Sequence, residues 1–139
     1  MTASSPEFTW PVRVYYEDTD MQGVVYYANY FRFMERARTE WIRSLGIEQD
    51  EFLREQRRLF VVVETRAEFR QSARFNDELV VTVELEERSR ASFLLRQRIH
   101  RDSLDGDLIC EGSVRAACIN ADTSKPARLP DLLFEEQTP

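Results

Sequence analysis

The sequence has few of the residues that form disulfides or bind metals. Its 139 residues include two cysteines, Cys110 and Cys118, and one histidine, His100. The cysteines lie eight positions apart in a segment with the pattern of one strand. Because a strand rises about 3.3 Å per residue, their sulfurs are too far apart to bond. One histidine without a C-x-x-C pair leaves too few ligands for zinc. We therefore expect reduced thiols, no metal and a cytoplasmic protein.

Long apolar runs are also absent. No run approaches the roughly 20 residues that cross a bilayer, and the first residues, MTASSPEFTW, lack the basic and apolar blocks of a secretory signal. Basic residues are fewer than acidic ones, 19 against 25, for a net charge of −6, whereas a nucleic-acid-binding protein normally presents a basic face. We therefore expect no transmembrane segment, no export and no nucleic-acid partner. A local arginine cluster could still hold a small phosphorylated ligand.

The remaining composition is that of a globular domain. Hydrophobic residues make up 42% and charged residues 32% of the chain, with only 4 glycines and 5 prolines. Such a balance argues against disorder, and the length suits one domain with its own core. We predict a single domain over residues 1–139, with irregular tails at 1–9 and 123–139.

The first third of the chain predicts a strand followed by helices. Residues 11–17 alternate and are β-branched or aromatic, which indicates a strand. From Val24 to Leu45 the apolar residues recur at helical spacing with charged residues largely between them, and Gly46 is a natural stop. A short second helix is expected over residues 48–57.

The rest of the chain predicts a sheet. The apolar period changes to two in four segments, 60–69, 79–87, 92–100 and 108–120. Each segment has one apolar and one more polar face, as in antiparallel strands covered on one side, and the last three are joined by links short enough for hairpins. A long helix packed against about five antiparallel strands is the economical α+β arrangement.

The segment YYEDTDMQGVVYY, residues 15–27, concentrates acids before the long helix. Acids there most commonly form turns and cap the helix, and we assign Glu17 and Asp18 to that role. Asp20 fits it less well, because a glycine and an apolar helix start follow. A carboxylate at this place can act as nucleophile or general base. The amides of the helix start can hold an oxyanion, and Gly23 lets the backbone approach a ligand.

The segment VRVYYEDTDMQGVVYYANYFRFMERARTEWIRSLGI, within residues 11–47, resembles the signature of the hotdog-fold acyl-CoA thioesterases. It is similar to the 4-hydroxybenzoyl-CoA thioesterase class, and most like the thioesterases associated with the bacterial Tol-Pal cluster. The resemblance implies a long central helix wrapped by a curved antiparallel sheet. It also implies dimers that often join as tetramers, active sites at subunit interfaces, and no metal or prosthetic group.

The resemblance also implies site residues. Asp20 matches the catalytic aspartate, and Tyr27 matches the position whose backbone N–H polarises the thioester carbonyl. Gly23 and Val25 are expected to line the substrate site. The Tol-Pal-associated branch often has histidine where this chain has Tyr27, and the hydroxybenzoyl branch has tyrosine. The difference leaves the backbone role intact and bears on the acyl preference.

Coenzyme A implies a place for its nucleotide phosphates. The family binds them on basic residues near the rim of the sheet, which favours Arg88 and Arg90 at a predicted hairpin, with Arg74 and Arg128 as alternatives. The alternative interpretation is that these exposed arginines only keep the surface soluble.

The implied activity is hydrolysis of an acyl-CoA to a free acid and CoA, with a short aliphatic, hydroxylated or aromatic acyl group. Asp20 either attacks the carbonyl to give a mixed anhydride or deprotonates a water. Glu35 and Glu40 on the helix are rival acids, although neighbouring arginines favour ion pairing. One alternative is a non-catalytic acyl-CoA or acyl-carrier binding module. The other is a hotdog dehydratase, which needs a histidine near its acid, whereas the one histidine of this chain is His100.

Overall fold

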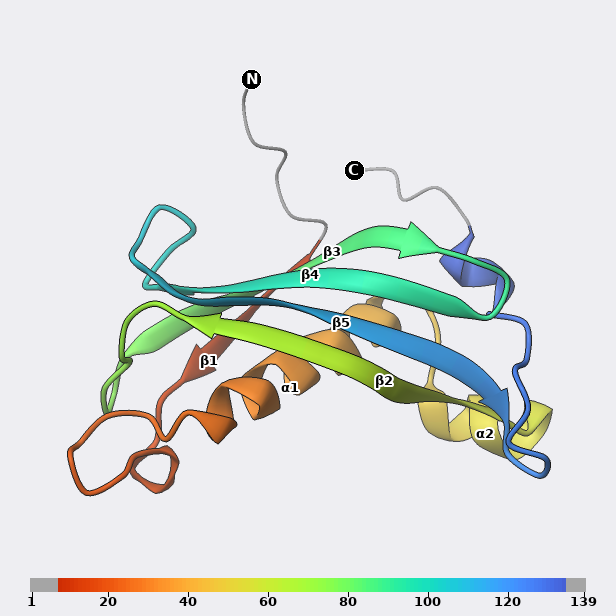
Figure 1. The fold of residues 1–139 in the computed structure, drawn as a ribbon, viewed down its shortest axis with the longest axis horizontal. Coiled ribbons are helices and arrows are strands. Elements are labelled where there is room, and N and C mark those ends of the chain that lie inside the picture. Colours follow the sequence, from red (N-terminus) through yellow and green to blue (C-terminus); the bar gives the residue numbers. More distant parts are fainter. Residues whose placement is uncertain (1–7, 135–139) are drawn as a thin grey trace.

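A computed structural model describes residues 8–134. The described chain forms five strands, two α-helices and two short 3-10 helices (Figure 1). In chain order they are β1 (Phe8–Arg13), η1 (Tyr16–Asp18), α1 (Ala28–Ser44), α2 (Gln49–Gln56), β2 (Arg58–Phe69), β3 (Glu78–Arg88), β4 (Ser92–Arg101), β5 (Leu108–Asn120) and η2 (Asp131–Leu133).

The strands form one antiparallel sheet in the order β1-β3-β4-β5-β2. The sheet arches over α1, which crosses one of its faces (Figure 1). This confirms the α+β hotdog arrangement expected from the resemblance. Within the described part of the chain, no helix is long and apolar enough to cross a membrane.

The core lies between α1 and the sheet. One stripe of α1 is buried and faces the alternate residues of β3 and β4, as the two apolar periods predict. Its fully buried members include Phe33, Met34, Ala37, Val81, Val83, Phe93, Leu95 and Ile99. The helix packs mainly against β1 and β3, while α2 covers part of β2. The flank between α1 and the edge strand β2 is consequently less filled.

The predicted boundaries of the first strand and of the long helix were wrong. The strand expected over residues 11–17 ends at Arg13, and the helix expected from Val24 begins at Ala28. The buried carboxylate of Asp18 accepts a hydrogen bond from the amide of Tyr15 at 2.8 Å, which turns the chain into η1. Residues 24 and 25 instead form isolated β-bridges. Tertiary pairing thus replaces an additional turn of helix.

The predicted tails are described only in part. Residues 1–7 and 135–139 lie outside the described residues, whereas Phe8 and Thr9 already belong to β1. The segment 121–134 packs on the domain: Leu129 and Leu133 are buried, and the amide of Leu129 donates to the carbonyl of Arg90 at 2.8 Å. The described part of that segment therefore closes one end of the core.

The strand β2 differs from its predicted pattern. The face of β2 that carries Val63 and Phe69 was expected to be buried, yet Val63 is 56% and Phe69 46% exposed. A bulge between Val62 and Glu64 shifts the alternation, and within residues 8–134 β2 is an edge strand that pairs with β5 alone. An apolar edge of this kind is a surface on which a further strand could pair.

Candidate active site

The acidic loop is a closed turn in front of α1. Thr19 and Val25 form a β-bridge, and the amide of Asp20 donates to the carbonyl of Val24 at 2.9 Å. The amide of Gly23 donates back to the carbonyl of Asp20 at 3.0 Å. Gly23 has a φ of +79°, which a residue without a side chain adopts readily. Its conformation therefore accounts for the glycine, and the space where a Cβ would stand is open.

The neighbouring chain holds this turn at both ends. The amide of Val25 donates to the carbonyl of Ala73 at 2.8 Å, and its side chain is 4% exposed in the core. The carbonyl of Asp18 accepts hydrogen bonds from the amide of Tyr26 at 3.0 Å and from Nδ2 of Asn29 at 2.9 Å. Asp18 therefore has the turn-forming role assigned to it. Val25 supports the loop from beneath, so its side chain does not face the surface of the loop.

The Asp20 carboxylate is on the exposed side of the turn. Its Oδ1 accepts a hydrogen bond from the amide of Gln22 at 2.8 Å, which orients the side chain. Among the described residues, no hydrogen bond or ion pair engages the other oxygen. One oxygen thus fixes the carboxylate while the other is available to a ligand.

The start of α1 presents unpartnered amides. Tyr27 already has helical angles, with φ −56° and ψ −32°. Within residues 8–134, the amides of Tyr27 and Ala28 donate no hydrogen bond. The first turn carries no acidic residue to offset the positive end of the helix dipole. This helix start is therefore suited to a developing negative charge.

Aromatic side chains form a cluster at the helix start, which the sequence patterns did not predict. The ring of Phe69, at the end of β2, lies 5.8 Å from those of Tyr27 and Tyr30 and 6.3 Å from that of Phe31 between centroids. Phe69 was expected on a buried face but is 46% exposed. The apolar alternation of β2 assigns Phe69 to the apolar face. It does not show that β2 ends at this residue, which leaves the ring at the edge of the sheet. The result is an apolar surface at the helix start.

Tyr30 ties this cluster to the loop. Its hydroxyl oxygen accepts a hydrogen bond from the amide of Ala73 at 3.0 Å. Burial raises the pKa of the Tyr30 phenol above its ordinary value, so it stays neutral at physiological pH. Since Ala73 also binds the Val25 amide, one short segment fixes both the loop and the first turn of α1.

The expected CoA ligands are not brought together with Asp20 within the described chain. Arg88 and Arg90 lie at the β3–β4 hairpin, at the opposite end of the sheet from the start of α1 (Figure 1). Nη1 of Arg88 donates to the carbonyl of Leu133 at 2.6 Å, and its guanidinium stacks on Phe134. Arg128 also stacks on Phe134. Arg74, in contrast, pairs through its backbone with Val24 and borders the acidic loop.

The rival acids and the histidine have other contacts. Glu40 forms an ion pair with Arg43 at 2.6 Å, as expected. Glu35 accepts a hydrogen bond from the Thr39 hydroxyl at 2.9 Å and forms no ion pair within the described residues. His100 is half-buried, with its Nδ1 3.1 Å from the carbonyl oxygen of Gly106. The histidine therefore interacts with a turn carbonyl and not with Asp20.

The chain is similar to known thioesterases over most of its length. Residues 14–136 match the thioesterase-like superfamily. The chain is 42% identical over 123 residues to the acyl-CoA thioesterase YbgC of Haemophilus influenzae, covering 88% of each. It is 40% identical over 129 residues to the acyl-CoA thioester hydrolase YbgC of Escherichia coli O157:H7, covering 93% of this chain and 94% of the relative. A probable thioesterase from Bartonella henselae superposes with a TM-score of 0.81 at 30% identity, covering 88% and 98%.

Proposed function

The chain belongs to the thioesterase-like superfamily, and we propose that it hydrolyses acyl-CoA thioesters with Asp20 as the catalytic carboxylate. The proposal is carried by two groups that stand close in sequence and lack a hydrogen-bond partner within the described chain: a carboxylate oxygen in the anchored loop and the main-chain amides of the helix that follows. An oxygen of Asp20 and the amides at the start of α1 have no partner among the described residues. A carboxylate and an oxyanion-binding amide are the two groups that acyl transfer needs.

The proposed chemistry divides the work between these groups. The thioester carbonyl oxygen accepts a hydrogen bond from the Tyr27 amide, which stabilises the negative charge that develops as the carbonyl is attacked. Loss of one such donor typically costs about 10²–10³ in rate. Asp20 either attacks the carbonyl carbon, releasing the CoA thiolate and leaving a mixed anhydride that water hydrolyses, or removes a proton from the attacking water. No cofactor takes part in either route.

The proposed active form is a homodimer or a dimer of dimers. The exposed valines of β2, and its outer edge that no described strand pairs with, support pairing with a second copy. Because Arg88 and Arg90 lie far from the acidic loop of their own protomer (Figure 1), their proposed contact with the CoA phosphates requires another protomer. The two buried free thiols support a cytoplasmic location.

The test is release of free thiol from acyl-CoAs of varied length, hydroxylation and aromaticity. A thioesterase releases CoA in proportion to time and enzyme from at least one member of the panel. An acyl-carrier binding module instead binds acyl-CoA, measured by calorimetry, with no release above the uncatalysed rate. The second outcome, for every member of the panel, would refute the proposed function.

A further inference from the structure

A short segment between β2 and β3, residues 71–77, holds both parts of the candidate active site (Figure 1). The carbonyl of Ala73 accepts a hydrogen bond from the amide of Val25 at 2.8 Å, which anchors the end of the acidic loop. The amide of Ala73 donates to the hydroxyl of Tyr30 at 3.0 Å, in the first turn of α1. The acidic loop and the start of α1 are therefore attached to the same residue.

Segment 71–77 depends on side chains for its position. Its ends bond to the rest of the fold through the main chain, at Val14 and Ile109. Between these ends, side chains hold three main-chain groups: the Ser72 carbonyl is bound by Arg101, the Ala73 amide by Tyr30 and the Arg74 amide by Asp77. The loss of one of these side chains would loosen the middle of the segment, which is the part that binds the acidic loop and α1.

Arg101, the last residue of β4, contacts this segment at several points. Its Nη2 donates to the carbonyl of Ser72 at 2.8 Å, and its Nη1 donates to Oε1 of Gln71 at 3.4 Å. Its Nε donates to Oδ2 of Asp77 at 3.3 Å. Asp107, just before β5, accepts from Nη1 at 2.8 Å and also holds the guanidinium. Because a guanidinium is planar and carries five donors, one side chain joins the two ends of the segment to the sheet.

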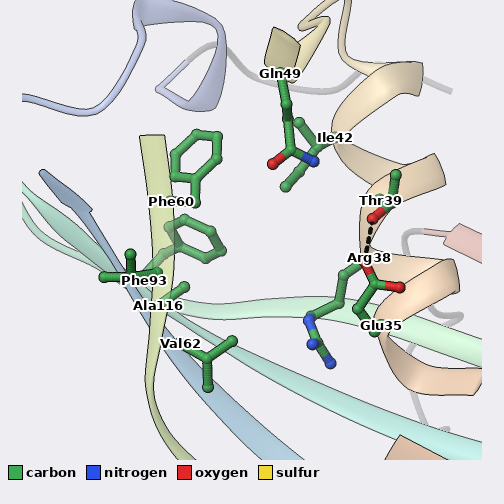
Figure 2. A pocket seen from close by; sticks show the side chains of 10 residues that line it. Glu35, Arg38, Thr39, Ile42, Gln49, Phe60, Val62, Phe93 and Ala116 are labelled. Carbon is green, nitrogen blue, oxygen red and sulfur yellow. Dashed lines mark hydrogen bonds between the residues drawn. The ribbon is translucent and has the colours of Figure 1, made fainter. Parts of the chain in front are cut away.

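Arg38 provides a contrast inside the fold. It borders a cavity between α1 and β2, where Figure 2 shows its guanidinium between the helix and the sheet. Its Nη1 donates to Oε1 of Gln97 at 3.0 Å, and Nε2 of Gln97 donates to the carbonyl of Met34. These contacts join the middle of α1 to β4. Arg38 thus holds the helix against the sheet, whereas Arg101 holds the segment to which the acidic loop is attached.

We propose that Arg101 is a positioning residue for the proposed hydrolysis, which sets the distance between the Asp20 carboxylate and the Tyr27 amide through segment 71–77. The inference rests on the proposed function and adds to it a residue that acts through others. Both groups must meet on one thioester carbonyl, and a displacement of about 1 Å can cost about a hundredfold in rate. Because the alignment matters most in the transition state, its loss lowers kcat more than it raises KM.

Arg98 provides a matched control three residues earlier on β4. The strand register places Arg101 opposite the buried Leu79, on the core face, whereas Arg98 is on the outer face and pairs with Glu84 at 3.1 Å. The side chains of Arg101 and Arg98 are 24% and 35% exposed, so both ion pairs are partly shielded. Among the described residues, no hydrogen bond or ion pair joins Arg98 to segment 71–77.

The first test measures kcat and KM of folded Arg101→Met and Arg98→Met on the acyl-CoA that the wild type hydrolyses fastest. Arg101→Met is expected to lower kcat by about ten- to a hundredfold and to change KM by less than about threefold. Arg101→Lys keeps the charge without the planar fork and should fall between the two. Arg98→Met should keep the wild-type kcat. An unchanged kcat in Arg101→Met, or a rise in KM alone, would overturn the proposal.

The second test combines Arg101→Met with Asp20→Asn. If Arg101 aligns the carboxylate with the amide, its replacement has little left to disturb once the carboxylate is gone. The loss caused by Arg101→Met should then shrink to within about threefold in the Asp20→Asn background. A merely structural role lowers the active fraction by the same factor in both backgrounds. That multiplicative result would overturn the proposal.

The third test follows hydrogen exchange of single amides by NMR. In Arg101→Met the amides of Val25 and Ala73 should exchange faster than in the wild type, because the segment that holds them is loosened. The amide of Cys118, which donates to the carbonyl of Ala91 at 2.8 Å, should be unchanged. Unchanged exchange at Val25 and Ala73 would overturn the proposal while an active wild type leaves the thioesterase function intact. An inactive wild type would instead refute the proposed function, and this inference with it.

Discussion

At the scale of single residues, the proposed chemistry is divided between a side chain and the main chain. Asp20 contributes a carboxylate whose position is set by the Gln22 amide, and Tyr27 contributes an amide whose availability is set by the helix start. Side-chain substitution at Tyr27 leaves that amide in place and alters the aromatic wall it shares with Phe69. Activity is therefore expected to be more sensitive at position 20 than at position 27.

The half-buried Arg38 and the buried Gln97 were not predicted to lie inside the fold, although the sequence carried a signal for both. Arg38 follows the buried Met34 by four positions, so it falls on the apolar stripe of the helix. Gln97 stands between Leu95 and Ile99, on the buried face of its strand. Each looked like an isolated exception to its pattern. Their hydrogen bond to each other depends on how α1 crosses β4, which no local pattern encodes.

Glycine substitutions provide a prediction at the residue scale. Gly23→Ala should destabilise the fold by about 1–2 kcal/mol, the cost of the left-handed conformation for an L-residue, because nothing lies within 4 Å of the added Cβ. Gly112→Ala should cost more, because its Cβ would lie 2.1 Å from the carbonyl oxygen of Arg66 on the adjacent strand. Urea unfolding of the two variants checks this order. Equal stabilities would contradict the close strand approach at Gly112.

At the scale of elements, the interior strands were the most predictable part of the fold. The period-two segments 79–87, 92–100 and 108–120 correspond closely to β3, β4 and β5, because each strand is covered on one face and the alternation records it directly. The end of β1 and the start of α1 were not predictable in this way. The end of β1 combines the local hydrogen bond between Asp18 and Tyr15 with a bond from Val14 to the carbonyl of Asp77. The chain before α1 is held by the carbonyl of Ala73, which is distant in sequence.

The thiols of β5 provide a prediction at the element scale. Burial raises the pKa of Cys110 from 9.0 to about 12, and burial also raises that of Cys118. Because the folded-state pKa is raised, the resulting stabilisation is fully present below the unfolded value and is lost as the pH rises through the folded value. At pH 8 only about one in 10⁴ Cys110 thiols is ionised. The native protein should therefore resist Ellman's reagent at pH 8, while the urea-unfolded chain should react at both cysteines.

The matched control is Cys118→Ser, which leaves Cys110 as the only thiol. Rapid labelling of this variant at pH 8, with an unchanged circular dichroism spectrum, would show that β5 is accessible in the folded state. Slow labelling whose rate follows unfolding is the expected result.

At the scale of the whole molecule, the two proposed binding features of the chain lie at opposite ends of the sheet. The acidic loop lies at one end and the β3–β4 hairpin with Arg88 and Arg90 at the other (Figure 1). The open flank beside β2 lies between α1 and the sheet edge. A second copy related by a two-fold axis would bring opposite ends together. The sequence predicted the loop and the arginines individually, but their proposed joint use requires a surface between chains, which a single-chain pattern does not describe.

The central claim is that the Asp20 carboxylate catalyses hydrolysis of the thioester. The most direct measurement is kcat of Asp20→Asn on the acyl-CoA of the panel that the wild type hydrolyses fastest. The expected result is a fall of about 10²–10⁴-fold, the range of a positioned acid or base, with little change in acyl-CoA affinity. Glu17→Gln, an exposed acid of the neighbouring 3-10 helix, should retain wild-type kcat. A folded Asp20→Asn enzyme with kcat within about threefold of the wild type would contradict the account.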